Sequence, residues 1–283
     1  MRRRIVPEIE SYQMADGQHK EEFMRLNHSM LFSSFDRNLI YDLGMNHGED
    51  SLFYLEKGFR VVAVEANPVI YSKMIKEFSN WIETGKLVIL NVGIWDSQNK
   101  LTFYKNLDND HWSSFDAGYG TRGGTRYEEV EIDCITLPML LAEHGTPYYL
   151  KVDIEGADKI AISSLASADV LPAFVSVEEY GAKCIEDLRD LGYDRFKIVP
   201  QGNKSSMNPA PSPAREGTYV ERWFSGRDTG LFGLELPGAW LPFQEAYSIF
   251  TSTIRDSSYS YIGPENEWFD VHATNTRVDG IDN

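Results

Sequence analysis

The sequence predicts an α/β fold in which helices cover both faces of a mostly parallel β-sheet. Short apolar runs rich in β-branched residues alternate with segments of helical period from residue 38 to about residue 200. The first run ends in a glycine turn, and the second precedes Asn67-Pro68, an N-cap residue followed by proline at the first helical position. Strands that alternate with helices in this way are typical of a parallel sheet, because parallel strands need long crossover connections.

Each element is expected from its local pattern. Ile70, Met74, Phe78 and Ile82 recur at a spacing of four and form one face of a helix, and Gly58 is a suitable end for the helix before it. The expected strands span residues 38–43, 60–65, 86–92, 101–104, 129–132, 148–154, 173–178, 195–199 and 267–273. One expected helix follows the glycine turn, and another begins after residue 156. The remaining helices are expected near residues 68–82, 136–144, 182–191 and 243–254.

One domain is expected over residues 36–283, preceded by an irregular N-terminal arm at residues 1–35. Residues 200–240 contain several prolines and glycines, a composition that interrupts regular elements. Because aromatic residues are frequent there, residues 200–265 are expected to form a long aromatic-rich insertion or lid in the C-terminal part, over the substrate.

Composition narrows the choice of partners. With 42% hydrophobic residues the chain is expected to fold, and its net charge of −16 argues against nucleic acid as a ligand. Cys134 and Cys184 are interpreted as two reduced, mostly buried thiols. No apolar stretch is long enough for a signal peptide or a membrane span, so a soluble, cytoplasmic protein without membrane contact is expected. A homodimer is left open.

The glycine turn at residues 42–48 is the first candidate for a ligand site. In open α/β sheets ligands bind beyond the carboxyl ends of the strands, and Gly44 and Gly48 would allow the backbone a close approach. Glu65 lies 21 residues after Gly44, at the end of the next strand. A carboxylate at this position accepts hydrogen bonds from ribose hydroxyls.

The charges around the turn favour a cationic cofactor. The dinucleotide fingerprint has three glycines, and here Glu49 and Asp50 begin the helix where a pyrophosphate would lie. Asp42 adds a third carboxylate. These groups suit the ammonium and sulfonium of S-adenosylmethionine (SAM) better than the phosphates of NAD. A NAD(P)-dependent oxidoreductase on a similar sheet remains the alternative.

Five segments together resemble the FkbM family of class I SAM-dependent methyltransferases. They are IYDLGMNHGEDS (40–51), VVAVEANP (61–68), LNVGIWD (90–96), EIDCITL (131–137) and YLKVDIEGAD (149–158). The resemblance covers residues 38 to about 200, and its KVDIEG segment is the most specific to the family. It implies a Rossmann-like sheet of seven strands with the last strand antiparallel, and O-methylation of a hydroxyl on a small natural product or a sugar.

The resemblance also implies which residues bind the cofactor. Asp42, Gly44 and Gly48 would meet the methionine part, Glu65 the ribose, and residues 92–96 the adenine. The full set of expected cofactor-binding residues is Asp42, Gly44, Asn46, Gly48, Glu65, Ala66, Val92, Gly93 and Asp153. The substrate does not follow from the resemblance, because the insertion after residue 200 matches the family least.

Candidate catalytic residues lie on the strand that contains the KVDIEG segment. Lys151, Asp153 and Glu155 alternate and so are expected on one face, where charges are tolerable only near a ligand. Asp153 would orient the acceptor hydroxyl or accept its proton, and Lys151 and His111 complete the candidate catalytic set. The alternative is a structural ion pair between Lys151 and Asp153, with Glu155 capping the next helix. His272 is a second lone histidine that could act as a base.

Two further alternatives concern a metal and a non-catalytic role. Asp153 together with Glu178 or Glu179 could hold a divalent metal, since carboxylates from adjacent strand ends suit Mg²⁺. We favour a metal-free site, because no third ligand is evident from the sequence. The chain could also bind SAM without catalysis and act on a partner through its aromatic insertion.

Overall fold

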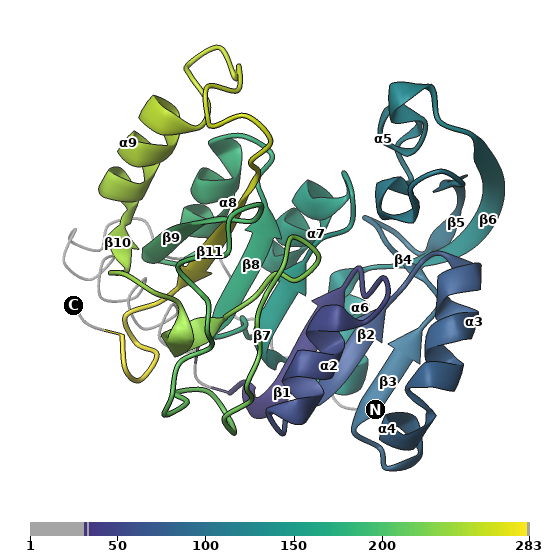
Figure 1. The fold of residues 1–283 in the computed structure, drawn as a ribbon, viewed down its shortest axis with the longest axis horizontal. Helices are drawn as coiled ribbons and strands as arrows, with labels where there is room; N and C mark the ends of the chain where they lie inside the picture. Colours follow the sequence, from purple (N-terminus) through teal and green to yellow (C-terminus); the bar gives the residue numbers. More distant parts are fainter. Residues whose placement is uncertain (1–30, 33, 282–283) are drawn as a thin grey trace, which may run out of the picture.

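The computed structural model describes residues 31–32 and 34–281 (Figure 1). Most of the arm expected at residues 1–35 therefore lies outside the described residues. Within the described part of the chain, no helix is long and apolar enough to cross a membrane. Cys134 and Cys184 are both buried and unpaired.

The main sheet has the mostly parallel arrangement that the sequence predicts. Its strands, in spatial order, are β10 (Leu241–Pro242), β9 (Arg195–Pro200), β11 (Phe269–Thr274), β8 (Phe174–Glu178), β7 (Pro147–Val152), β1 (Asp36–Leu43), β2 (Arg60–Val64) and β3 (Leu87–Leu90). Strands β8, β7, β1, β2 and β3 pair in parallel, and β11 lies antiparallel between β8 and β9. The expected antiparallel last strand is thus confirmed. The sheet has eight strands instead of seven, because the two-residue strand β10 pairs with the edge of β9.

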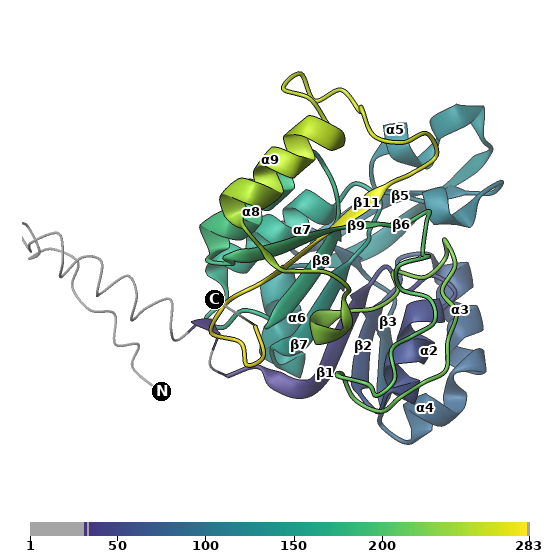
Figure 2. The same cartoon turned by 60° about the vertical axis from the view of Figure 1, so that its left-hand side comes forward.

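Helices cover both faces of this sheet, each burying apolar side chains against the strands (Figures 1 and 2). One face packs against α6 (Leu137–His144), α7 (Asp158–Ser164), α8 (Lys183–Leu191) and α9 (Phe243–Thr253). The other packs against α2 (Glu49–Glu56), α3 (Pro68–Glu77) and α4 (Ser79–Glu83). Asn67 caps α3 as expected, since its side chain accepts a hydrogen bond from the Val69 amide at 3.0 Å.

A second, smaller sheet lies apart from the main one, beyond α3 in Figure 1. It consists of β4 (Gly93–Ile94), β6 (Tyr127–Ile135) and β5 (Asn99–Asn106), in that order. The loop between β5 and β6 contains the short helix α5 (Ala117–Gly120) and two 3₁₀ turns, at Asp110–Trp112 and Arg122–Gly124. The two half-exposed strands expected near residues 101 and 129 therefore pair with each other and belong to this sheet.

Residues 200–240 cross the α2 face of the main sheet with little regular structure of their own (Figure 2). Phe232 stacks on Tyr149 of β7 with ring centroids 4.9 Å apart, and Phe224 meets Phe53 of α2 edge-on at 5.1 Å. Both phenylalanines are buried in the same cluster as α2 and α3. Much of this segment therefore completes the core where a helix would otherwise lie.

Candidate functional site

The glycine turn at the end of β1 is locked to the end of β7. Gly44 has a φ of +84°, and a Cβ at this position would lie 1.8 Å from the carbonyl oxygen of Asp153. The Asp153 amide in turn donates a hydrogen bond of 3.0 Å to the Leu43 carbonyl. Glycine is required here because the two strand ends pass too closely for any side chain.

Two of the residues expected to touch the cofactor face the protein interior instead. Asp42 has no exposed surface, and its carboxylate accepts hydrogen bonds from Ser51 at 2.6 Å and Lys151 at 3.0 Å. A Cβ on Gly48 would lie 2.7 Å from the ring of Phe78. Both residues contact the turn on its buried side, and neither lines either of the two cavities described below.

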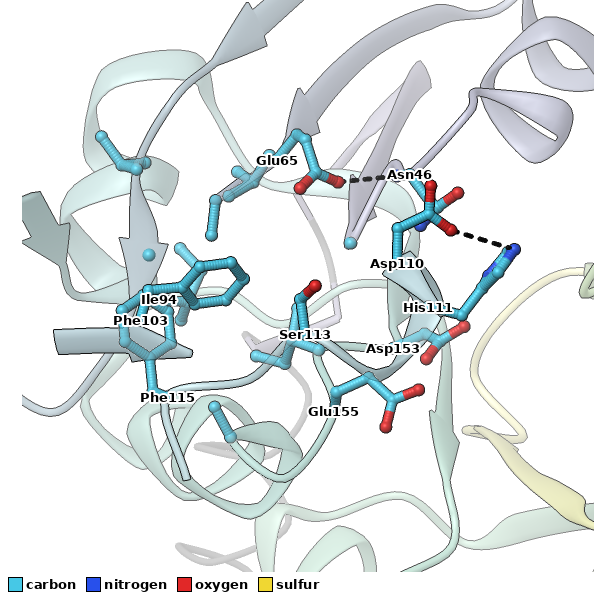
Figure 3. Close-up of a pocket in the computed structure, with 17 residues that line it drawn as sticks. Asn46, Glu65, Ile94, Phe103, Asp110, His111, Ser113, Phe115, Asp153 and Glu155 are labelled. Carbon is cyan, nitrogen blue, oxygen red and sulfur yellow. Dashed lines mark hydrogen bonds and ion pairs between the residues drawn. The ribbon is translucent and has the colours of Figure 1, made fainter. Parts of the chain in front are cut away.

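Glu65 is held rigidly at the end of β2. Its carboxylate accepts a hydrogen bond from the Asn46 amide at 2.8 Å (Figure 3) and another from the Asn67 amide at 2.7 Å. Burial raises the pKa of Glu65 to about 7, although these two hydrogen bonds oppose the shift. Each oxygen keeps a further lone pair, so the carboxylate can accept hydrogen bonds from two ligand hydroxyls.

A cavity, here called the turn cavity, opens between Glu65, the glycine turn and the second sheet (Figure 3). Ile94, Phe103 and Phe115 gather at one end, Asp110, Asp153 and Glu155 lie toward the other end, and Glu65 lies between them. Seven of the nine expected cofactor-binding residues line it: Gly44, Asn46, Glu65, Ala66, Val92, Gly93 and Asp153.

Sequence reasoning missed the aromatic end of the turn cavity. Phe103 lies on β5, and Phe115 follows in the β5–β6 loop, where its ring would clash with a Cβ on Gly93. The alternation of polar and apolar residues along β5 predicts that one face of this strand is buried. It does not indicate which part of the chain covers that face. The pairing of Gly93 with Phe115 therefore had no local signal.

A second cavity, here called the acidic cavity, adjoins the turn cavity and has a volume of about 430 Å³. Gly44, Asn46, His111, Asp153 and Glu155 line both cavities. The rest of the acidic cavity comes from the glycine turn and α2, the β5–β6 loop, Lys151 of β7, Glu178 of β8, the segment after residue 200 and the start of β11. The segment expected as an insertion or lid contributes Gln201 and residues 226–229 to this cavity. Trp268, which follows that segment, also lines it.

Lys151 is a buried cation shared among carboxylates. Its Nζ lies 3.0 Å from Asp42, 3.7 Å from Asp50 and 3.7 Å from Asp153. Burial works against its charge, but these carboxylates outweigh burial and keep the pKa of Lys151 well above its ordinary value. Lys151 therefore stays protonated beside these carboxylates and holds them in place, and the catalytic role expected for it stays a prediction.

Asp153 is the most accessible member of this group. Its side chain is 46% exposed, against 4% for Lys151, and it points into the junction of the two cavities. The ion pair between Lys151 and Asp153, considered as the alternative to a catalytic role, is formed at 3.7 Å. It leaves most of the Asp153 carboxylate open to a ligand.

The two histidines considered as bases, His111 and His272, differ in their exposure and in their position relative to the cavities. His111 lines both cavities with a side chain 43% exposed, and its Nε2 lies 3.9 Å from Asp110 (Figure 3). His272 is buried, burial lowers its pKa to about 3, and it lines neither cavity. His272 is thus excluded as a base. His47, which sequence reasoning missed, is bonded to the other oxygen of Asp110 at 2.9 Å.

Glu155 and Glu178 join Asp153 in an acidic group. Carboxylate oxygens of the three lie within 4.8 Å of one another. Burial raises the pKa of Glu155 to about 8, and Asp153 adds to the shift while Arg122, 2.9 Å away, opposes it. Burial likewise raises the pKa of Glu178 well above its ordinary value.

The structure bears on two of the alternatives for this region. Glu179, one of the two ligands considered beside Asp153 if a metal were bound, pairs with Arg255 at 2.6 Å. Glu155 does not cap the next helix; Asp158 accepts hydrogen bonds from the amides of Ile154 and Gly156 at 3.0 and 2.9 Å. Glu155 has a φ of 48° beyond the end of β7, so its position comes from the turn and not from strand alternation.

The segment after residue 200 is attached to α2 at the edge of the acidic cavity. The Thr229 amide donates to both oxygens of Asp50, at 2.9 and 3.1 Å. Arg222 bonds the Glu49 carbonyl at 3.0 Å and Asp228 at 2.6 Å. These contacts fix the wall of the cavity to the helix that follows the glycine turn.

Comparison with solved structures finds distant likenesses to methyltransferases. Precorrin-6y C5,15-methyltransferase from Geobacter metallireducens GS-15 is 11% identical, with 90% of this chain and 87% of that chain covered and a TM-score of 0.38. Methyltransferase FkbM from Methylobacillus flagellatus KT is 18% identical over 54% of this chain and 37% of that chain, with a TM-score of 0.33. A SAM-dependent O-methyltransferase from Thermotoga maritima is 9% identical over 95% and 69%, with a TM-score of 0.36. No curated protein sequence matches the chain.

These likenesses are too distant to support an argument about the site, and the assignment rests on a domain match. The strand order and the matched domain define a SAM-dependent methyltransferase. Residues 42–194, more than half of the chain, match the methyltransferase FkbM domain, and the chain belongs to this family. The alternative of a NAD(P)-dependent oxidoreductase is thereby removed.

Proposed function

We propose that this methyltransferase transfers the methyl group of SAM to a hydroxyl of a small natural product or a sugar. The observation that carries the proposal is the position of Asp153, which borders both the turn cavity and the acidic cavity. One cavity would hold the methyl donor and the other the acceptor, and they meet at a partly exposed carboxylate.

The lining of the turn cavity suits SAM in its polarity and its charge. Its apolar end, with Ile94, Phe103 and Phe115, matches the adenine ring, and Glu65 is placed to accept both ribose hydroxyls. Its acidic end lies where the sulfonium and the ammonium group would be. SAM supplies a methyl group that is already activated for displacement, so the protein has to bind, orient and exclude water.

The acidic cavity provides the means to orient an acceptor hydroxyl. Asp153 accepts a hydrogen bond from the hydroxyl, which aligns its oxygen with the methyl group. Lys151 fixes the Asp153 carboxylate from behind. As the new C–O bond forms, the hydroxyl proton passes to Asp153 or to His111, both of which line the cavity, and the electron pair of the S–CH₃ bond remains on sulfur.

The test combines cofactor binding with methyl transfer. SAM labelled in its methyl group is incubated with the full chain and pools of hydroxyl-bearing small molecules and sugars, and Asp153→Asn is compared with wild type. We expect turnover of the variant to fall by about 10²–10⁴-fold while the Kd for SAM, measured by calorimetry, stays within about threefold. Asp169→Asn, an exposed change beyond the amino end of β8, is the matched control.

Three results would contradict the proposal. Label transferred only to amines or carbon atoms would rule out O-methylation. SAM binding without transfer to any pool would favour the non-catalytic alternative. A normal turnover in Asp153→Asn would remove Asp153 from the mechanism.

A further inference from the structure

The acidic cavity brings together carboxylates from neighbouring strand ends that no ion pair fully accounts for. Asp153 and Glu155 follow β7, Glu178 ends β8, and one oxygen from each lies within 4.8 Å of the others. Two oxygen ligands on opposite sides of a Mg²⁺ or Ca²⁺ ion are about 4–5 Å apart. The three carboxylates therefore already have the spacing that a bound divalent cation requires.

A fourth carboxylate supports the same interpretation independently. Asp270 begins β11 and stands directly opposite Glu178 in the antiparallel register. It is only 7% exposed and lines the acidic cavity, yet its carboxylate forms no hydrogen bond and no ion pair within the described residues. Lys204 and Lys151 attract this carboxylate from a distance without forming an ion pair with it, so its oxygens remain open to a cationic ligand in the cavity.

The nearby basic groups leave ligand oxygens free. Arg122 bonds only Oε2 of Glu155, and Lys151 lies nearer to Asp42 than to Asp153. The Glu178 side chain accepts no hydrogen bond from any described residue. Arg122, Lys151 and Arg227 are the basic residues that line the cavity, and carboxylates outnumber them. The free carboxylate oxygens are the ligands that hard divalent cations prefer.

We propose that Asp153, Glu155, Glu178 and Asp270 form a binding site for a divalent cation of the Mg²⁺, Mn²⁺ or Ca²⁺ class. Glu179, the ligand that strand position alone suggests, is excluded by its pairing with Arg255. The role of the ion rests on the proposed function: it holds the acceptor hydroxyl beside the methyl donor and lowers the pKa of that hydroxyl. The hydroxyl proton passes to His111, which lines the same cavity, and no oxidant or reductant is needed.

Binding of the metal alone is the direct test. The full chain is treated with EDTA, freed of the chelator, and titrated with Mn²⁺, Mg²⁺ and Ca²⁺ by calorimetry, without SAM and without an acceptor. We expect one site per chain, with a Kd of about 1 mM or tighter for at least one ion. If none of the three ions binds in this range, the proposal is overturned.

Variants locate the site. Glu178→Gln and Asp270→Asn should each weaken metal binding by about 10-fold or more, because each removes a charged ligand. Glu49→Gln removes one negative charge from the same cavity without touching the group of four, so its metal affinity should stay within about twofold. Equal losses in all three variants would indicate nonspecific attraction by the acidic cavity and would contradict a defined site.

Thermal unfolding without metal shows whether the variants fold. Because each substitution removes a charge that the other carboxylates repel, we expect Glu178→Gln and Asp270→Asn to unfold at or above the wild-type temperature. If the chain binds metal but not SAM, the proposed function is contradicted and the metal site is retained. Methyl transfer that persists undiminished in EDTA would overturn the role proposed for the ion and leave the methyltransferase function standing, while the titration without SAM decides the site itself.

Discussion

Gly44 is the residue on which the geometry of the turn depends most. Its positive φ is shared with other glycines, but only here would a Cβ meet a backbone carbonyl at 1.8 Å. The sequence correctly singled out this glycine, although for the approach of a ligand. The structure adds that it also lets the ends of β1 and β7 meet, which places Asp153 at the junction of the cavities.

Gly44→Ala should therefore cost more than an ordinary glycine substitution. We expect the free energy of unfolding to fall by about 3 kcal/mol or more, since backbone strain adds to a steric clash, and SAM binding to weaken. Gly85→Ala is the control: its φ is +69°, but a Cβ there meets no atom within 4 Å, so only about 1–2 kcal/mol should be lost. Urea denaturation measures both. Equal losses would show that the contact with Asp153 is unimportant.

Glu65 predicts a pH dependence of SAM binding. The ribose hydroxyls need the ionised carboxylate, and burial raises the pKa of Glu65 to about 7 against opposition from its two amide hydrogen bonds. Affinity should thus be full above pH 7 and fall by about tenfold for each pH unit below it. Glu65→Gln should bind SAM weakly and without this dependence.

The stability of the fold should respond to Glu65 with the opposite sign. A carboxyl whose pKa is raised on folding favours the folded state at low pH, and this contribution is lost as the pH rises from about 4.5 through 7. Weak SAM binding at pH 6 therefore cannot be caused by Glu65 unfolding the protein. Calorimetric titration between pH 6 and 8 checks the prediction, and a flat wild-type profile would contradict it.

At the scale of elements, the segment after residue 200 is the part that sequence patterns described least well. Its aromatic residues suggested a lid, but Phe224 and Phe232 pack on α2 and β7. Only Gln201 and residues 226–229 of its first half reach the acidic cavity. Aromatic composition cannot distinguish a cover from a core, because both bury the same kind of side chain.

The attachment of this segment to α2 can be tested through Arg222. Arg222→Gln should lower the local opening free energy of residues 225–229 by about 1–3 kcal/mol, because it removes charge-assisted hydrogen bonds to Asp228 and the Glu49 carbonyl. Hydrogen exchange of these amides measures the effect. Arg126→Gln breaks an ion pair with Asp108 whose arginine is 77% exposed and screened by solvent, so its effect should be much smaller than that of Arg222→Gln. Unchanged exchange in Arg222→Gln would show that other contacts hold the segment.

At the scale of the whole molecule, the sequence predicted the layers of the fold and most of the residues that gather around the turn cavity. The alternation of strands and helices, the turn at Gly44 and the position of Glu65 are local features. Local features can be recognised in a single sequence because they depend on residues close together in the chain. The edge strand β10 was not foreseen, because two residues have no period. The aromatic wall from the second sheet and the pairing of Asp270 with Glu178 join distant parts of the chain, and no local pattern encodes such contacts.

The central claim is that the methyl donor lies in the turn cavity with its reactive end at Asp153. A crystal structure of the full chain with S-adenosylhomocysteine tests it most directly. We predict both ribose hydroxyls within hydrogen-bond distance of Glu65, the adenine among Ile94, Phe103 and Phe115, and the sulfur facing Asp153 and the acidic cavity. A ligand bound away from Glu65, or one whose sulfur faces away from the acidic cavity, would contradict the account.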